Sequence, residues 1–270
     1  MRRKMLVLDI DGTLTNSQKQ ITPRTLEALL RIQQEGHIVT LASGRPTAGL
    51  RMASSALQLE RYGGYLLSYN GAHILHHKSG RVLFERVLPK ETLSQICAFA
   101  REEGIGLLTY RENTILTSFA HDPYMEQESR INALPILDVE DLVSYVQFPI
   151  YKCLLTAPPQ RAAQLEAILV ERYGQSLSIY RSEPYFIEVM PPEVDKALSL
   201  GRLLEAIDMP VADAIACGDG FNDISMIHFA GTGVAMANAQ EVVKREADFI
   251  TRSNDEDGVV EVIEKFLEGD

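Results

Sequence analysis

The sequence predicts an α/β protein with a doubly wound, Rossmann-like parallel sheet, into which a second module of the α+β class is inserted. Three observations support this fold class. Short apolar runs alternate with amphipathic segments over residues 1–82 and again over 186–270, as in parallel sheets covered by helices on both faces. Residues 83–185 instead show paired short strands between helices. A chain of 270 residues is long enough for two domains.

The first elements have clear signals. Unbroken apolar runs predict strands buried on both faces, at residues 5–8, 38–42 and 65–69. Thr22 and Pro23 are typical of a helix start, and Gly36 is typical of a helix end, so a capped helix lies between the first two strands. A second helix is expected after Pro46. This β-α-β-α-β order indicates a parallel sheet.

The middle of the chain has a different order of predicted elements. Helices are expected over residues 89–103, near Tyr124 and over 160–172, and short strands over 107–110, 114–118 and near Ile179. We therefore interpret residues 83–185 as an inserted α+β domain with a largely antiparallel sheet.

The doubly wound pattern resumes near Phe186. Strands are expected over residues 186–190, 214–217, 233–237 and 249–250, and helices over 195–207, near Glu241 and over 259–267. The sequence thus predicts a discontinuous core domain formed by residues 1–82 and 186–270.

Composition excludes several classes of function. The net charge of −11 at pH 7 argues against nucleic acid as a partner and implies that an anionic substrate is bound by local contacts. No apolar run reaches the roughly 18 residues that span a membrane, and the basic start of the chain is too close to Asp9 for a secretory signal. Three scattered cysteines favour a reducing compartment, so we expect a cytoplasmic protein. The oligomeric state is not encoded in a readable pattern.

The most informative motif is Asp9-Ile10-Asp11-Gly12-Thr13, directly after the first predicted strand. Asp9 and Asp11 leave such a strand on the same side, at the end where ligands bind in open α/β sheets. Two adjacent acids repel each other unless a cation lies between them. The motif therefore predicts a magnesium-assisted nucleophile beside a proton donor. The alternative is an ordinary Asp-Gly turn.

Two single residues lie at other strand and helix ends of the core. Ser43 offers a hydroxyl and a backbone N–H near a helix start, which suits an anion, although serine is also a common N-cap. Lys196 opens the helix after Pro191 and Pro192, where a cation is disfavoured unless an anion shares the site. The alternative for Lys196 is a solvated surface lysine.

The second strong motif is Gly218-Asp219-Gly220-Phe221-Asn222-Asp223, where a strand ends and a helix begins. Asp219 can reach a metal, Asn222 can donate to a phosphoryl oxygen, and Asp223 can bind the metal directly or orient its ligands. Turn and cap chemistry is again the alternative. Together these groups supply what phosphoryl transfer needs: a carboxylate nucleophile, a cation, phosphate donors and an acid.

These motifs resemble those of haloacid dehalogenase (HAD) superfamily phosphatases, specifically the Cof-type group with a large α/β cap inserted between the second and third motifs. The resemblance covers essentially the whole chain. The second motif is matched by Ala42-Ser43-Gly44-Arg45, and the third by Lys196, although Ala197 stands where the family usually has glycine. Asn70-Gly71 and Arg45 also occur in the family pattern, which makes Arg45 and Asn70 possible substrate contacts.

The resemblance implies a role for each matched residue. Asp9 attacks phosphorus and forms a covalent intermediate, and Asp11 protonates the leaving group and then activates water. Mg²⁺ is held by Asp9, the backbone carbonyl of Asp11, and Asp219, with support from Asp223. The implied phosphate-binding residues are Ile10, Ser43, Gly44, Lys196 and Asn222.

The expected function is hydrolysis of small phosphorylated metabolites, most of all sugar phosphates. A phosphomutase or phosphotransferase would need the same acids, but mutases of this kind usually carry a small helical cap, whereas strand pairs are predicted here. A non-catalytic regulator that binds phosphorylated metabolites is the weakest alternative, because every group needed for turnover is present. The sequence does not define which metabolite is bound or which cap residues contact it.

Overall fold

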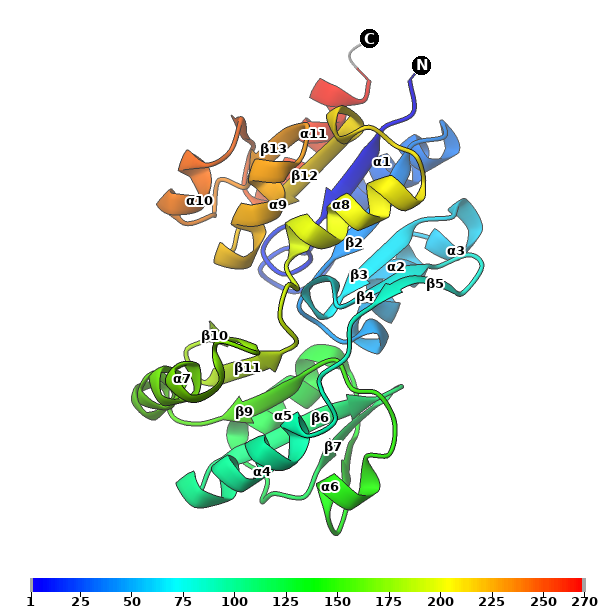
Figure 1. Cartoon of the computed structure of the whole chain (residues 1–270). Coiled ribbons are helices and arrows are strands. Elements are labelled where there is room, and N and C mark those ends of the chain that lie inside the picture. Colours follow the sequence, from blue (N-terminus) through cyan, green and yellow to red (C-terminus); the bar gives the residue numbers. More distant parts are fainter. Residues whose placement is uncertain (1, 269–270) are drawn as a thin grey trace. The chain divides into compact units, whose positions relative to one another are not determined.

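The computed structural model of the protein describes residues 2–268 and contains two compact units (Figure 1). The first unit comprises the chain up to Gly44, Leu50–Glu85 and the chain from Asp195 onward. The second comprises Arg45–Gly49 and Arg86–Val194. The predicted α/β fold class is confirmed.

The first unit is built on an eight-stranded sheet with the order β14-β13-β12-β1-β2-β3-β4-β5. The strands from β14 to β3 are parallel, and β4 and β5 are antiparallel additions at one edge. Their bounds are β1 Met5–Leu8, β2 Ile38–Ala42, β3 Tyr65–Ser68, β4 His73–His76, β5 Arg81–Glu85, β12 Ala214–Gly218, β13 Thr232–Ala235 and β14 Phe249–Ile250.

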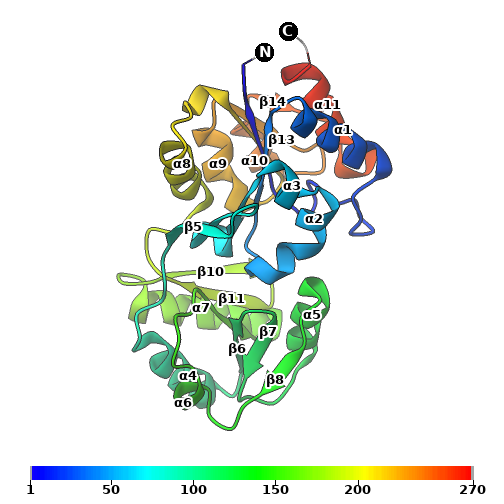
Figure 2. The ribbon, with the colours of Figure 1, turned by 90° about the vertical axis from the view of Figure 1, so that its right-hand side faces the viewer.

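Helices cover both faces of this sheet, as expected for buried parallel strands. Their bounds are α1 Pro23–Gln34, α2 Arg51–Ala56, α3 Leu59–Tyr62, α8 Lys196–Ala206, α9 Ile224–Phe229, α10 Glu241–Arg245 and α11 Gly258–Phe266. Alternate residues of β1 show the two faces. Leu6 and Leu8 join the core under α1 and α11, while Met5 and Val7 pack with α8 and α9 (Figures 1 and 2).

The second unit contains a six-stranded sheet with the order β10-β11-β9-β6-β7-β8. All pairs are antiparallel except β7 with β8. The strand bounds are β6 Gly106–Arg111, β7 Thr114–Thr117, β8 Ile136–Asp138, β9 Cys153–Thr156, β10 Ser178–Glu183 and β11 Phe186–Met190. The helix bounds are α4 Thr92–Glu103, α5 Pro123–Asn132, α6 Leu142–Tyr145 and α7 Pro159–Tyr173.

The two faces of this second sheet differ. Leu107 of β6 points into an apolar core shared with α4, α6 and α7. Tyr110, which leaves β6 on the opposite side, donates a 2.6 Å hydrogen bond to Glu128 of α5. Lys152, which precedes β9, forms a buried ion pair at 3.2 Å with Glu188 of β11, and its Nζ lies 5.3 Å from the centre of the Tyr110 ring. Helix α5 therefore covers the face opposite the main core of the second unit.

One strand lies in a different sheet from the one we expected. Residues 186–190 were expected to return the chain to the parallel sheet, but β11 pairs with β9 and β10 in the second unit. The chain returns to the first unit at Asp195. All five residues of β11 are buried, and a fully buried strand has the same apolar pattern in either kind of sheet.

Short 3-10 turns connect several of these elements, at Thr47–Leu50, Tyr69–Gly71, Val211–Asp213, Phe221–Asp223 and Asn254–Glu256. Within residues 2–268, no helix combines the length and apolar character needed to cross a membrane. Cys97, Cys153 and Cys217 are all buried and free.

Candidate active site

The predicted motifs meet at one edge of the parallel sheet. Asp9 follows β1, Ser43 follows β2, and Asp219 follows β12. These three strands are neighbours in the order β12-β1-β2 and run in the same direction. Their carboxyl ends therefore bring the three side chains to the same edge, where ligands bind in open α/β sheets.

Lys196 joins this edge from the first residue of α8. Asp195 caps the helix by accepting from the backbone N–H of Leu198 at 2.8 Å. The Lys196 Nζ atom lies 2.6 Å from Asp9 Oδ1 and 2.5 Å from Asp223 Oδ1, and its side chain is 0% exposed. A helix N-terminus disfavours a cation, and the two carboxylates offset this cost. Lys196 is thus a buried ion-pair partner and not a surface lysine.

Three acids surround this lysine. Asp9, Asp219 and Asp223 each place a carboxylate oxygen within 4.8 Å of the others. Asp223 is fixed by two backbone donors, because its Oδ2 accepts from the N–H groups of Asp219 at 3.0 Å and Gly220 at 2.9 Å. Thr13 donates to Asp219 Oδ1 at 2.9 Å. Hydrogen bonds from the chain therefore fix Asp219 and Asp223.

Burial and mutual repulsion perturb these acids. Burial, with Asp223 nearby and Lys196 opposing, raises the pKa of Asp9 to about 8. Burial and the proximity of Asp223 also raise the pKa of Asp219 to about 6, against the hydrogen bond from Thr13. Burial alone would lower the pKa of Lys196, but Asp223 and Asp9 outweigh it and raise that pKa. Three acids share one lysine, so the site has an excess of negative charge that a divalent cation would neutralise.

Gly12 allows the first motif to pass close to Asp219 of the acid cluster. Its φ is +86°, and a Cβ atom built on it would lie 2.3 Å from Asp219 Oδ2. Any other residue would therefore be strained and would also displace a carboxylate. The carboxylate of Asp11 is 35% exposed and forms an ion pair with Lys19 at 2.9 Å.

A polar group beside Ser43 forms the other side of the site. The backbone N–H of Asn70 donates to the Ser43 carbonyl at 2.9 Å, and Asn222 Nδ2 donates to Asn70 Oδ1 at 3.2 Å. A Cβ atom on Gly44 would lie 3.2 Å from Asn70 Nδ2. Asn70 has a left-handed φ of 51°, which asparagine adopts more readily than most residues. Ser43, Gly44, Asn70 and Asn222 are thus brought together.

Two predicted residues are placed differently from this group. The Ile10 side chain is buried in the core of the first unit, so only its backbone is available to a ligand. Arg45 Nη1 donates to the backbone carbonyl of Ile131 at 2.8 Å, within the second unit.

Several residues at the site had no predicted role. Lys19 pairs with Asp11, and Asn238 Nδ2 donates to the Gly12 carbonyl at 2.8 Å. No local sequence pattern could identify Lys19 and Asn238, because both contacts depend on how loops fold in the tertiary structure. Phe221 is 62% exposed although it lies inside the second strong motif. An aromatic residue in the turn between a strand and a helix is the sequence signal that could have identified it.

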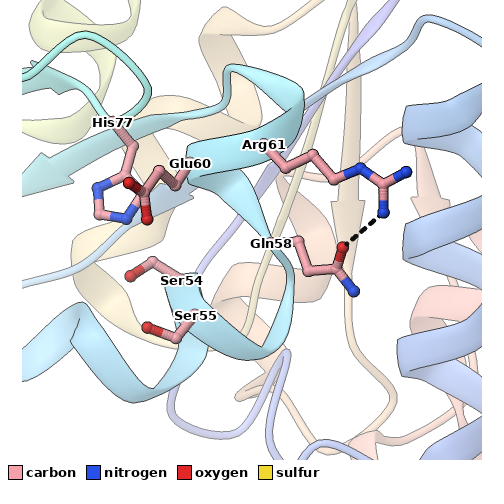
Figure 3. A pocket seen from close by; sticks show the side chains of 6 residues that line it. All are labelled: Ser54, Ser55, Gln58, Glu60, Arg61 and His77. Atoms are coloured by element: carbon pink, nitrogen blue, oxygen red, sulfur yellow. Dashed lines mark hydrogen bonds between the residues drawn. The ribbon is translucent and has the colours of Figure 1, made fainter.

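A separate polar pocket of about 400 Å³ lies on the first unit (Figure 3). It is lined by Ser54, Ser55, Gln58, Glu60, Arg61 and His77. Arg61 Nη1 donates to Gln58 Oε1 at 3.3 Å across one side of it. None of the predicted site residues lines this pocket, so we assign the chemistry to the strand ends.

Comparisons with known proteins identify the family of the chain. Residues 6–263 match the model of the haloacid dehalogenase-like hydrolase family. A crystal structure of a haloacid dehalogenase-like hydrolase from Bacteroides thetaiotaomicron is 45% identical, with a TM-score of 0.95 over 98% of this chain and 100% of that one. The chain therefore belongs to the haloacid dehalogenase-like hydrolase family.

Two further relatives are phosphatases by name. A structure described as a sugar phosphatase of HAD subclass IIB is 25% identical, with a TM-score of 0.82 over 97% of this chain and 98% of that one. The 5-amino-6-(5-phospho-D-ribitylamino)uracil phosphatase YitU of Bacillus subtilis is 27% identical and is matched over 97% of both chains. These relatives support the enzyme class expected from the sequence, a phosphatase.

Proposed function

We propose that this chain is a Mg²⁺-dependent phosphatase that hydrolyses small phosphorylated metabolites, sugar phosphates foremost, through an aspartyl-phosphate intermediate on Asp9. One observation carries this proposal: a fully buried lysine bridges Asp9 and Asp223 beside a third acid, Asp219. This arrangement keeps a carboxylate nucleophile next to a cation site and a permanent positive charge, as phosphoryl transfer requires.

The donor set suits magnesium. The carboxylates of Asp9, Asp219 and Asp223 would hold the ion together with the backbone carbonyl of Asp11, and hard oxygen ligands are what Mg²⁺ prefers. When bound, Mg²⁺ would neutralise the negative charge of the acids and of the phosphoryl oxygens.

The residues of the chain would then carry out two half-reactions. Asp9 attacks phosphorus while the bond from phosphorus to the leaving oxygen breaks, and Asp11 gives its proton to that oxygen. In the second half, Asp11 takes a proton from a water molecule that attacks the aspartyl phosphate, which restores Asp9 and releases phosphate. Lys196 holds Asp9 in position and stabilises the charge on the phosphoryl group.

The phosphoryl group needs further donors, and the strand ends provide them. We assign this role to the Ser43 hydroxyl, the Asn222 amide and backbone groups of Ile10 and Gly44. Asn70 would position Asn222 and the turn after β2, since it contacts both. Aligned donors of this kind lower the barrier because they need no reorganisation during the reaction.

We infer that the second unit selects the substrate. Its main segment, Arg86–Val194, is inserted between the segment that carries Ser43 and the segment that carries Lys196, so the proposed catalytic groups all come from the first unit. The name of the similar sugar phosphatase and that of the ribitylaminouracil phosphatase both describe phosphate esters of polyhydroxylated metabolites. Sugar phosphates are therefore the first class to test.

The decisive experiment measures inorganic phosphate released from a generic aryl phosphate and from a panel of phosphorylated metabolites, with Mg²⁺ and with a chelator. We expect Mg²⁺-dependent release from several sugar phosphates and none from the Asp9→Asn variant. A phosphomutase would move phosphate between hydroxyl groups of one sugar without releasing it, and a regulator would bind sugar phosphates without turnover. Either result would contradict the proposal.

A further inference from the structure

Residues 16–20 form a tight turn after the first motif, which we call the Asn16 turn. The Asn16 N–H donates to the Gln20 carbonyl at 2.9 Å, and the Lys19 N–H donates to the Asn16 carbonyl at 2.8 Å. Asn16 Oδ1 also accepts from the N–H groups of Gln18 at 3.0 Å and Gln20 at 2.9 Å. Lys19 has a left-handed φ of 59°, which lysine rarely adopts, so these bonds of the turn determine its backbone conformation.

The chain between the first motif and the Asn16 turn is closely wound. The N–H and the hydroxyl of Thr15 both donate to the Ile10 carbonyl at 2.9 Å. The Thr15 carbonyl in turn accepts from Asn254 Nδ2 at 2.9 Å. This winding keeps the Asn16 turn close to Asp11, the proposed acid.

The Asn16 turn is also fixed from the 3-10 turn Asn254–Glu256. Asp255 accepts from the Ser17 N–H at 2.8 Å with Oδ1 and from the Ser17 hydroxyl at 2.6 Å with Oδ2. The hydroxyl and the N–H of Ser17 lower the pKa of Asp255, because they stabilise its charged form. Both residues belong to the first unit, so the turn and the acid cluster are parts of one compact unit.

The side chain of Lys19 extends from this turn to Asp11. Its Nζ lies 2.9 Å from Asp11 Oδ1, and the two side chains are 62% and 35% exposed. Exposed ion pairs are weak partly because two flexible side chains must be held in one arrangement. Here hydrogen bonds fix the backbone next to both partners, so only the side chains lose freedom when the pair forms. The pair therefore favours one orientation of the Asp11 carboxylate.

We propose that Lys19 is a positioning residue for the Asp11 carboxylate, and that Asp255 supports it by holding the Asn16 turn. The inference rests on the proposed function, in which Asp11 gives its proton to the leaving oxygen. A general acid must lie within hydrogen-bond reach of the atom that it protonates. A carboxyl group without its positioning partner meets this condition less often, so leaving groups that need a proton depart more slowly.

The test compares two kinds of leaving group in the Lys19→Met variant. An alkyl phosphate such as a sugar phosphate needs a proton on its leaving oxygen, whereas a nitrophenyl phosphate releases a phenolate that leaves without one. The ratio kcat/KM covers the reaction up to this departure. We expect Lys19→Met to lower kcat/KM by about fivefold for alkyl phosphates, the upper range for an exposed ion pair, and by less than about twofold for a nitrophenyl phosphate.

Two control variants test whether the charge of Lys19 is responsible. Lys19→Arg keeps the positive charge and should restore kcat/KM for alkyl phosphates to within about twofold of the wild type. Arg24→Met is the matched control, because it removes the cation of another exposed ion pair of the first unit. Arg24 pairs with Glu264 at 3.2 Å, and their side chains are 55% and 53% exposed. This variant should leave both kcat/KM values unchanged.

Two further variants test whether Lys19 acts through Asp11. Asp11→Asn removes the carboxylate that Lys19 positions, so adding Lys19→Met to Asp11→Asn should change kcat/KM by less than about twofold. Asp255→Ala removes both acceptors of Ser17 and leaves the ion pair itself intact. It should slow alkyl phosphates selectively, as Lys19→Met does, but to a smaller extent.

Three outcomes would overturn the inference. Equal losses of kcat/KM for both kinds of leaving group would show a general structural role of Lys19. A Lys19→Arg variant as slow as Lys19→Met would show that the charge is not responsible. An undiminished effect of Lys19→Met in the Asp11→Asn background would show that Lys19 acts without Asp11. If Asp11→Asn itself had normal kcat/KM for alkyl phosphates, or if the wild type released no phosphate, the proposed function would fail instead, so the two failures are distinguishable.

Discussion

The carboxylate of Asp11 lies beside Lys19, whereas Asp9, Asp219 and Asp223 surround the buried Lys196. These different surroundings match the two roles proposed for the acids, proton transfer for Asp11 and metal binding for the cluster. In the proposed mechanism the side chain of Asp11 transfers protons, and Asp11 would contact Mg²⁺ through its backbone carbonyl. On this proposed assignment, replacing the Asp11 side chain would remove no metal ligand.

Asp11→Asn should lower kcat by about 100-fold or more, the usual contribution of a general acid and base, while the dissociation constant for Mg²⁺ stays within about twofold of the wild type. Asp219→Asn should weaken Mg²⁺ binding instead. Titration calorimetry gives the metal affinities and phosphate release gives kcat. If Asp11→Asn lost Mg²⁺, the carbonyl-only assignment would be wrong.

Lys196 is predicted to be essential for stability as well as for activity. Lys196→Met would leave two buried acids, Asp9 and Asp223, without their cation, and breaking a buried ion pair in this way costs about 3–5 kcal/mol. Urea unfolding in the presence of a chelator measures this loss. Lys244→Met removes a lysine paired with Glu241 near the surface and should cost less than about 1 kcal/mol. Equal losses for the two variants would contradict the buried role.

The sequence was sufficient to predict the residues at strand ends but not those that reach the site from loops. Asp9, Ser43 and Asp219 follow buried strands, and the carboxyl ends of parallel strands share one edge of a sheet, so their proximity follows from topology. Lys19 and Asn238 reach the site through turns whose path depends on tertiary packing. Arg45 has a local signal in its motif, yet its contact with Ile131 involves a residue 86 positions away.

At the scale of elements, α8 links helix capping to the site. Asp195 caps the helix through the N–H of Leu198, and Lys196 is the next residue. Asp195→Ala should destabilise the fold by about 1 kcal/mol, as lost N-caps do. It should also lower kcat/KM, because the first turn of α8 would no longer hold Lys196 in a fixed position. Thr22→Ala removes the N-cap of α1 and should cost similar stability with normal kcat/KM. Steady-state kinetics beside thermal melts separates the two effects.

The prediction of elements succeeded where hydrophobic periodicity and helix caps agree. It assigned one fully buried strand to the wrong sheet. The signals at Thr22, Pro23 and Gly36 predicted a helix close to the observed α1. The apolar run at 186–190 predicted a strand correctly, but hydrophobic periodicity carries no information on pairing partners. Only the antiparallel register with β9 and β10 assigns it to the second unit. Strand pairing depends on non-local contacts.

At the scale of the whole molecule, the acid cluster links folding, pH and metal binding. Without metal, the raised pKa of Asp9, about 8, means that the folded protein keeps a proton that the unfolded chain, with an ordinary pKa near 3.8, has lost. Asp219, with a pKa of about 6, adds to this effect over a narrower range. The contribution to stability is therefore fully present below about pH 4 and is lost as the pH rises toward 8.

Magnesium should reverse this trend, because on the proposed function it would bind the deprotonated carboxylates and displace their protons. We expect the melting temperature measured with a chelator to fall between pH 6 and pH 8 relative to that of Asp9→Asn, which lacks the titrating group. The rise in melting temperature caused by a fixed excess of Mg²⁺ should grow over the same interval, since Mg²⁺ affinity increases up to about tenfold per pH unit for each proton displaced. Calorimetry in buffers of different ionisation enthalpy should detect the released proton at pH 7. A shift caused by Mg²⁺ that stayed constant with pH, or Mg²⁺ binding without proton release, would show that Asp9 is already ionised in the metal-free protein.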